Sequence, residues 1–103
     1  MDKDAVLMVV QRFRAALEKQ GVRNARMVLY GSWAGGHPHE GSDIDLVVIA
    51  EDFAGKGYWE RIDLLSAAIW EVFEPIEAVA MTPAEWDARE SMIAEFARSG
   101  ETV

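Results

Sequence analysis

The chain has 103 residues, of which 50% are hydrophobic and 27% are charged, the balance of a small globular protein rather than a disordered one. Its 10 basic and 18 acidic residues give a formal charge of −8, which argues against extended nucleic-acid binding and against binding to anionic membranes. No apolar run approaches the roughly 20 residues of a membrane span, and the acidic N-terminus is unlike a secretory signal. We therefore expect one cytoplasmic domain over residues 1–103, free of disulfides because the chain has no cysteine.

The first half of the chain predicts a helix followed by two strands. Apolar residues recur every three or four positions over residues 4–19, which is typical of an amphipathic helix. Residues 25–30 resemble a strand, and the glycine-rich residues 31–42 predict a turn that encloses one short helical turn at 32–34. Residues 43–49 predict a second strand, whose β-branched far end is buried on both faces.

The second half predicts a helix, a strand and a last helix. An amphipathic pattern covers residues 58–73 and is broken by Pro75, and residues 76–80 form a short third strand. Thr82 to Glu85 has the composition of a helix start, with threonine as the N-cap and glutamate three residues later, and this helix ends near Gly100. The order α-β-(turn)-β-α-β-α predicts an α+β fold, in which helices flank a small mixed sheet of about three strands.

Four tryptophans divide into two groups. Trp59, Trp70 and Trp86 occur at helical spacing with other apolar residues, so we expect them in the core. Trp33 lies in the glycine-rich turn, where it either covers a ligand or a partner surface, or wedges the turn against the core.

Two aspartates at the start of the second strand form a candidate metal site. Side chains alternate along a strand, so Asp43 and Asp45 point to the same face with Cα atoms about 6–7 Å apart. Two carboxylates on one face repel each other unless a cation lies between them. A hard cation such as Mg²⁺ prefers carboxylate and phosphate oxygens, and would relieve this repulsion.

Gly31 and Ser32 form a candidate phosphate site one loop earlier. A sharp turn after a strand exposes backbone N–H groups, and glycine lets the backbone approach a phosphate closely. The serine hydroxyl can donate a further hydrogen bond to a phosphate oxygen. A phosphate turn beside an acidic pair predicts a site for a metal–triphosphate complex.

These residues carry a resemblance to a known family. The pattern Gly31-Ser32, then Ala34 and Gly36, then Ser42-Asp43-Ile44-Asp45-Leu46 resembles the minimal nucleotidyltransferases of the DNA polymerase β superfamily. The resemblance implies that Asp43 and Asp45 hold two Mg²⁺ or Mn²⁺ ions and that the Gly31-Ser32 turn holds the β/γ-phosphates. It also implies transfer of a nucleoside monophosphate from a nucleoside triphosphate, with ATP expected, to an acceptor hydroxyl.

The family also uses a third carboxylate on a later strand, where it binds metal and helps to deprotonate the acceptor. Glu77 is the candidate here, Glu74 is an alternative, and Glu77 could instead be an ordinary exposed strand residue. Many relatives carry arginine near the phosphates at the positions of Trp33 and Gly35. Here the phosphate charge would be met by metal and backbone alone, unless Lys56 or Arg61 reaches the site.

Short proteins of this type resemble antitoxin partners of HEPN-domain toxins. That resemblance implies an acceptor hydroxyl on a protein partner, which this short chain would need because it lacks an acceptor-binding domain. The alternative is a catalytically weak or inactive binding module that neutralises a HEPN-type toxin by contact alone. A chain of this size also has a limited core, so a homo-oligomer is a further expectation.

Overall fold

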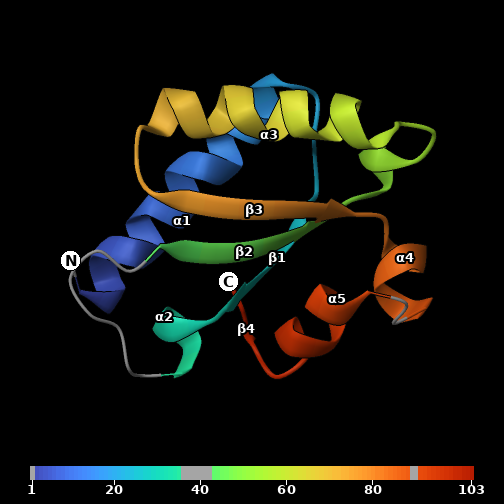
Figure 1. Cartoon of the computed structure of the whole chain (residues 1–103). Coiled ribbons are helices and arrows are strands. Elements are labelled where there is room, and N and C mark those ends of the chain that lie inside the picture. Colours follow the sequence, from blue (N-terminus) through green and yellow to red (C-terminus); the bar gives the residue numbers. More distant parts are fainter. Residues whose placement is uncertain (1, 36–42, 89–90) are drawn as a thin grey trace.

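A four-stranded mixed sheet with helices on both faces forms the protein, and the computed structural model describes residues 2–35, 43–88 and 91–103 (Figure 1). The strand order is β3-β2-β1-β4, with β1 antiparallel to β2 and β4, and β2 parallel to β3. The elements are α1 (Lys3–Lys19), β1 (Arg26–Tyr30), α2 (Ser32–Gly35), β2 (Ile44–Ile49), a 3-10 turn (Glu51–Phe53), α3 (Tyr58–Val72), β3 (Ile76–Met81), α4 (Pro83–Ala88), α5 (Met92–Ala97) and β4 (Glu101–Thr102).

The α+β class, the predicted helix α1 and the short helical turn α2 are confirmed, and predicted strand boundaries agree within one residue. The central strand β2 is buried on both faces at its far end, as its β-branched run predicts. None of the helices in the described ranges is long and apolar enough to cross a bilayer. The glycine-rich residues 36–42, which include Gly36 and Ser42 of the predicted motif, lie outside the described residues.

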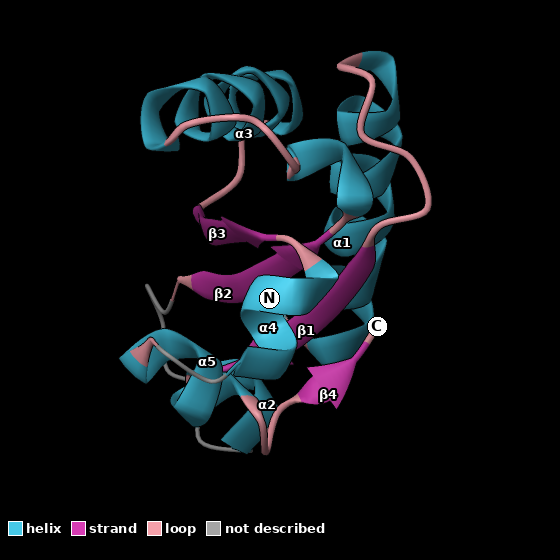
Figure 2. Ribbon diagram, turned by 90° about the vertical axis from the view of Figure 1, so that its right-hand side faces the viewer, coloured by secondary structure: helices cyan, strands magenta, loops and turns pink. Residues whose placement is uncertain are grey.

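The sheet separates two apolar clusters (Figure 2). α1 and α3 cover one face, where Ile44, Leu46 and Val48 of β2 belong to the larger cluster. α4 and α5 cover the other face, where Val47 and Ile49 belong to the smaller cluster. Because side chains alternate along β2, Asp45 lies on the same face as Val47 and Ile49, the face of α4 and α5.

Two features of the sheet and the last helix differ from the prediction. A fourth strand, β4, pairs with β1 at Val28↔Thr102 and Leu29↔Glu101. Two residues are too short to leave a periodic pattern, so the sequence contained no signal for it. The predicted last helix is two helices, α4 and α5, and α5 ends at Ala97 rather than near Gly100.

The prediction that three tryptophans lie in the core is wrong for two of them. Trp86 is buried against the α4–α5 face, but Trp59 is 73% exposed and Trp70 is 77% exposed. Both exposed residues lie on α3, whose inner face is instead filled by Leu65, Ala68 and Val72. Helical spacing alone does not identify the buried face when large apolar residues lie on both sides of a helix.

The predicted capping box at the start of α4 is confirmed. The Glu85 N–H donates to the Thr82 hydroxyl (3.1 Å), and the Thr82 N–H donates to the Glu85 carboxylate (2.8 Å). The same carboxylate accepts from Arg61 of α3 (2.6 Å), so it ties α4 to the opposite layer. The hydrogen bond from Arg61, followed by that from the Thr82 N–H, lowers the pKa of Glu85.

Glu85→Gln is expected to destabilise the protein by about 0.5 kcal/mol at neutral pH, a small value because the carboxylate is half exposed. A carboxyl group with a lowered folded-state pKa stabilises the fold above its unfolded pKa, and loses this effect as pH falls through the folded value. Urea unfolding from pH 7 down to about pH 3 should therefore show the two proteins converging. Glu60→Gln, on the exposed first turn of α3, is the control, and a constant Glu85→Gln deficit at every pH would contradict the assignment.

Candidate active site

A row of polar side chains crosses three strands at the end of the sheet beside α2. The register pairs Tyr30 of β1 with Asp45 of β2, and Asp45 with Glu77 of β3. Paired residues on neighbouring strands share a face and lie on strands about 4.7–4.9 Å apart. One phenol and two carboxylates therefore lie side by side on the face of α4 and α5.

Asp43 joins this row from the residue before β2. It is exposed, and its carboxylate lies close enough to Glu77 to raise the pKa of that residue. The structure thus brings together all three predicted carboxylates. Glu77, rather than Glu74 in the turn before Pro75, occupies the position next to the pair.

The row carries more negative charge than the fold neutralises. The carboxylates of Asp43 and then Asp45 raise the pKa of Glu77. Burial raises the pKa of Asp45, with a further contribution from Asp43, although the hydrogen bond from Glu77 acts in the opposite direction. Burial, then the charges of Asp45 and Glu77, raise the pKa of the Tyr30 phenol. Each shift marks a cluster that would be relieved by a cation.

The Gly31 turn lies directly against this cluster. Gly31 has φ +73°, and a Cβ built on it would lie 2.3 Å from the Asp45 Oδ2 atom. Only glycine fits such a position, because both the left-handed backbone and the contact exclude a side chain. Ser32 follows as the first residue of α2 and is partly exposed. The predicted phosphate turn and the predicted metal ligands are therefore neighbours in space.

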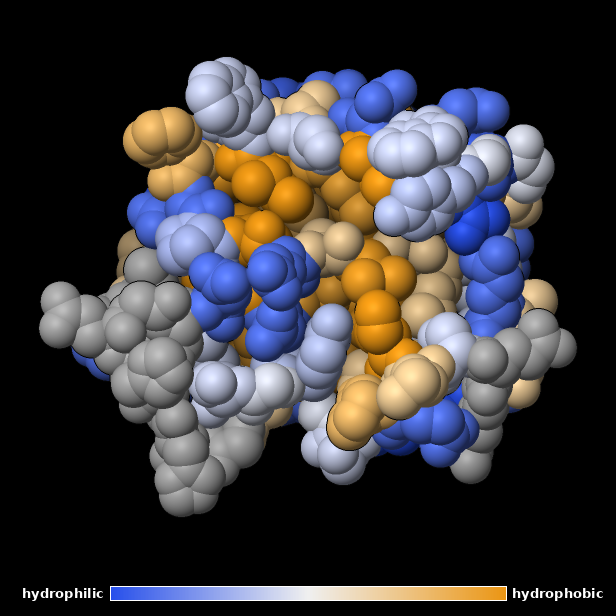
Figure 3. Space-filling view, in the orientation of Figure 1, coloured by the Kyte–Doolittle hydropathy of each residue, from blue (hydrophilic) through white to orange (hydrophobic). Residues whose placement is uncertain are grey.

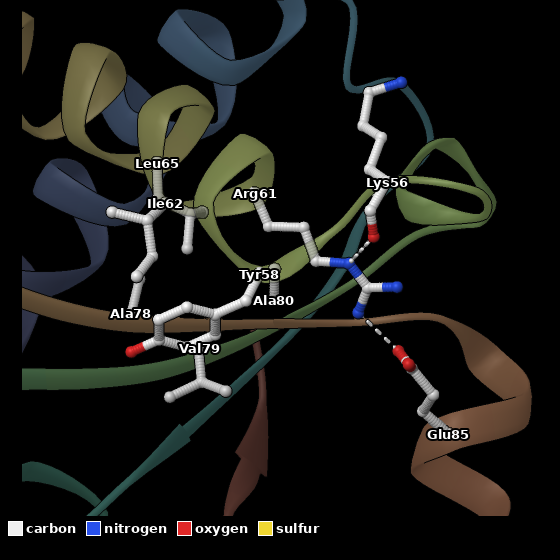
Figure 4. A pocket seen from close by; sticks show the side chains of 9 residues that line it. All are labelled: Lys56, Tyr58, Arg61, Ile62, Leu65, Ala78, Val79, Ala80 and Glu85. Atoms are coloured by element: carbon white, nitrogen blue, oxygen red, sulfur yellow. Dashed lines mark hydrogen bonds and ion pairs between the residues drawn. The ribbon is translucent and has the colours of Figure 1, made fainter.

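The cations weighed as phosphate ligands lie elsewhere. Arg61 donates to the Lys56 carbonyl (3.0 Å) and to Glu85 (2.6 Å) (Figure 4). Both Arg61 and Glu85 lie beside Ala80 and Met81, at the other end of β3 from Glu77. Trp33 is 8% exposed and packs in the larger apolar cluster, which confirms the interpretation that it wedges the turn against the core.

Sequence reasoning missed two residues near the turn, Tyr30 and Lys3. The Lys3 ammonium lies 3.5 Å from the Trp33 carbonyl of α2 and 3.1 Å from a carboxylate oxygen of Glu101. The position of Tyr30 in the sequence could have identified it, because it directly precedes the turn and ends a strand that was expected to pair with the strand of Asp45. Lys3 had none, because 30 residues separate it from Trp33.

The donor set fits a metal that arrives with a ligand better than a permanent metal. In the described ranges, no three His, Cys, Asp or Glu side chains, Asp43, Asp45 and Glu77 included, are arranged so that together they could hold a metal ion. Mg²⁺ is usually held by one or two carboxylates together with water and substrate phosphates. Asp43 and Asp45, with Glu77 beside them, can supply those carboxylates.

Comparisons with known proteins concern the family and the fold of the chain. Residues 10–98 match the sequence profile of the nucleotidyltransferase domain. No curated protein sequence matches the chain significantly. The fold is similar to a candidate nucleotidyltransferase from Sulfolobus solfataricus, with a TM-score of 0.73 and 14% identity over 97% of this chain and 80% of that one.

A second solved structure, also of a candidate nucleotidyltransferase, has a TM-score of 0.59 and 26% identity, over 84% of this chain and 89% of the other. The likeness to the Sulfolobus protein concerns the fold, whereas the profile match covers most of the 103 residues in sequence. The chain therefore belongs to the nucleotidyltransferase domain family.

Proposed function

We propose that the protein is a metal-dependent nucleotidyltransferase that moves a nucleoside monophosphate from a nucleoside triphosphate, with ATP as the expected donor, to an acceptor hydroxyl. The acceptor oxygen bonds to the α-phosphorus, the bond between the α-phosphorus and the bridging oxygen breaks, and pyrophosphate leaves. The observation that carries this proposal is the contact between the Gly31 turn and Asp45, in the same row as Glu77 and next to Asp43. A phosphate-binding turn and a cluster of carboxylates meet at one end of the sheet, which is what transfer from a triphosphate requires.

Each residue of the site has a distinct role in this proposal. Asp43 and Asp45 would hold Mg²⁺ or Mn²⁺, and the bound ion would neutralise phosphate charge and polarise the reacting oxygens. The backbone N–H groups of the Gly31-Ser32 turn and the Ser32 hydroxyl hold the β/γ-phosphates. Glu77, whose pKa is raised by its two neighbours, would bind the metal next to them and would accept the proton of the acceptor hydroxyl.

The acceptor hydroxyl in this proposal belongs to a partner protein of the HEPN-domain type. The motivating feature is the sequence resemblance to antitoxins of that system. The carboxylate row lies at an exposed end of the sheet, with Asp43 and Glu77 both exposed, so a large acceptor could approach it. A basic partner would also complement the formal charge of −8.

Labelled nucleotide transfer tests the proposal directly. The protein is incubated with each nucleoside triphosphate labelled at the α-phosphate, with Mg²⁺ or Mn²⁺, and with candidate protein acceptors. Labelled acceptor is expected with the wild type and with Asp87→Asn, a control on the exposed surface of α4, but not with Asp43→Asn. Labelling that is absent from the wild type, or unchanged in Asp43→Asn, would count against transferase activity at this site.

A second candidate function is a binding module that neutralises its partner without chemistry. Two observations favour it. Arg61 forms an ion pair with Glu85, and the buried Trp33 occupies a position where many relatives carry an arginine near the phosphates. Toxin neutralisation that survives Asp45→Asn would identify binding as sufficient. If Asp45→Asn still binds the toxin but no longer neutralises it, nucleotidyl transfer is necessary for neutralisation.

A further inference from the structure

We propose that two copies of this chain form a symmetric dimer through the open edge of β3 and the outer face of α3. This inference goes beyond the proposed function and does not depend on it. It rests on three features of one side of the molecule: a strand edge that pairs with no other strand among the described residues, a row of exposed aromatic residues, and the position of a single two-fold axis that serves both.

The first feature is the edge of β3, which is the outermost strand on its side of the sheet. The carbonyls of Pro75 and Met81 accept from β2 residue Ile44 (2.8 Å) and from Ala50 (3.0 Å). In a parallel ladder, alternate residues face the neighbouring strand, so the backbone groups of Ala78 and Ala80 point away from β2. An apolar edge of this length, with one charged side chain, is the kind that proteins normally cover.

The second feature is the outer face of α3. Trp59, Trp70 and Phe73 are 73%, 77% and 77% exposed. Trp59 and Trp70 are 11 residues apart and therefore lie on one face of the helix. Phe73 caps the helix with a left-handed backbone, and its ring centroid lies 5.8 Å from that of Trp70. Ser66 lies midway between Trp59 and Phe73 on the same face, seven residues from each. In a second, antiparallel copy of α3 that crosses at Ser66, Trp59 of one chain meets Phe73 of the other. The face is therefore complementary to itself, as a two-fold interface must be.

The third feature is the alignment of α3 with β3. The two elements run in opposite directions along the same side of the molecule and are joined by a short turn (Figure 1). Ser66 lies about 9 Å back from the end of α3 at 1.5 Å per residue, and Val79 lies about 10 Å along β3 at 3.3 Å per residue. One axis can therefore pass through both positions. The two β3 strands then run antiparallel, with Val79 of one copy opposite Val79 of the other. In this register Ala78 pairs with Ala80 of the second copy, and Glu77 lies opposite Met81 rather than another Glu77.

The exposed area is consistent with a stable dimer. The three aromatic residues of this face and Tyr58, which is 70% exposed, present roughly 600 Å² if a full aromatic side chain has about 150–250 Å². The strand edge adds to this value, and a standard interface buries about 800 Å² on each partner.

An apolar hollow connects the two contact surfaces (Figure 3). A cavity of about 420 Å³ lies between α3 and β3, with Ile62, Leu65 and Ala78 among the residues that line it. The ring of Tyr58 lies over Val79 at this edge (Figure 4). Because Tyr58 is mostly exposed, it can turn away from the edge with little loss of packing when a second strand pairs there.

Oligomeric mass and cross-linking test the dimer. Light scattering across a concentration series should give twice the mass of one chain. The dimer should strengthen with added salt, because each copy carries a formal charge of −8. The chain has no cysteine, so oxidised Val79→Cys should give one cross-linked dimer, whereas Ser99→Cys, an exposed position outside the interface, should not.

Trp70→Glu is expected to weaken the dimer at least about tenfold, since a central aromatic residue is replaced by a charge in both copies. Phe96→Glu, a 69% exposed aromatic residue on α5, is the matched control and should leave the mass unchanged. Circular dichroism checks that both variants are folded. A monomer at every concentration, or a dimer that Trp70→Glu leaves intact and Val79→Cys does not cross-link, would overturn the proposal; neither result bears on nucleotidyl transfer.

Discussion

Replacing Asp45 with asparagine is expected to abolish nucleotidyl transfer and, at the same time, to make the protein more stable. The proposed reaction needs the carboxylate charge to hold the metal, so its loss should lower the transfer rate by about 10³-fold or more. The stability of the folded protein should change in the opposite direction and increase. Burial and the neighbouring charge of Asp43 disfavour the charged form of Asp45 and raise its pKa, although the interaction with Glu77 acts in the opposite direction. Because solvent screens this partly exposed group, removing the charge should raise the free energy of unfolding by about 0.5 kcal/mol, or roughly 2–4 °C in Tm.

The pH dependence follows from the same shifts. A carboxyl group whose folded-state pKa is raised costs the fold stability as pH rises from its unfolded pKa through its folded pKa. The raised pKa values of Asp45 and Glu77 therefore predict that the wild type becomes less stable as the pH rises above the range in which ordinary carboxyl groups lose their protons. This loss should be smaller in Asp45→Asn.

Thermal unfolding separates the two effects of this substitution. Without ligand, Asp45→Asn should have the higher Tm, and Asp87→Asn, on the exposed surface of α4, should match the wild type. With Mg²⁺ and ATP, the wild type should gain stability from binding, whereas Asp45→Asn should gain little. A variant that is less stable than the wild type, or that responds to Mg²⁺–ATP equally well, would argue against Asp45 as a metal ligand.

The fold could be predicted from sequence wherever a periodic pattern was long. The amphipathic stripe of α1 and the β-branched run of β2 gave boundaries within one residue of the observed ones. The prediction was wrong where large apolar residues lie on the outer face of a helix, as Trp59 and Trp70 do. If a second copy covers these residues, these large apolar side chains are buried in the dimer, as is usual, although they are exposed in the single chain.

The candidate site could be predicted in part, because alternation along a strand is a local property. It placed Asp43 and Asp45 on one face without any knowledge of the sheet. The position of Glu77 next to them, and the presence of Tyr30 in the same row, depend on the register between strands. Register arises from packing between distant segments, so no periodicity within one strand encodes it.

Gly31→Ala is expected to damage both the fold and the site, because two separate physical effects meet at this residue. The backbone has φ +73°, which an alanine adopts only with strain, and the new Cβ would lie 2.3 Å from the Asp45 Oδ2 atom. The strain alone should cost about 1 kcal/mol, and displacement of Asp45 should add to it. Since Asp45 is a proposed metal ligand, a displacement of about 1 Å could lower transfer by about 10²-fold.

Gly55→Ala is the control that separates the backbone strain from the contact with Asp45. Gly55 has a similar φ of +78°, but a Cβ built there meets nothing within 4 Å, so this variant shares the backbone strain without the contact. Chemical denaturation of both variants should therefore show a larger loss of stability for Gly31→Ala, and only Gly31→Ala should lose transfer. Equal losses of stability, with transfer retained in both variants, would mean that the turn does not position Asp45.

A double variant then links the contact to its partner. Combining Gly31→Ala with Asp45→Ala removes the two nearest atoms that the new Cβ would meet and leaves only the Cβ of residue 45, at an ordinary contact distance of 3.5 Å. The stability losses should therefore not add, and the double variant should be more stable than Gly31→Ala alone. Transfer should remain absent, because the carboxylate is gone. Recovery of stability without recovery of activity would tie the glycine at the turn to the position of one carboxylate, which is the relationship on which the proposed metal–triphosphate site depends.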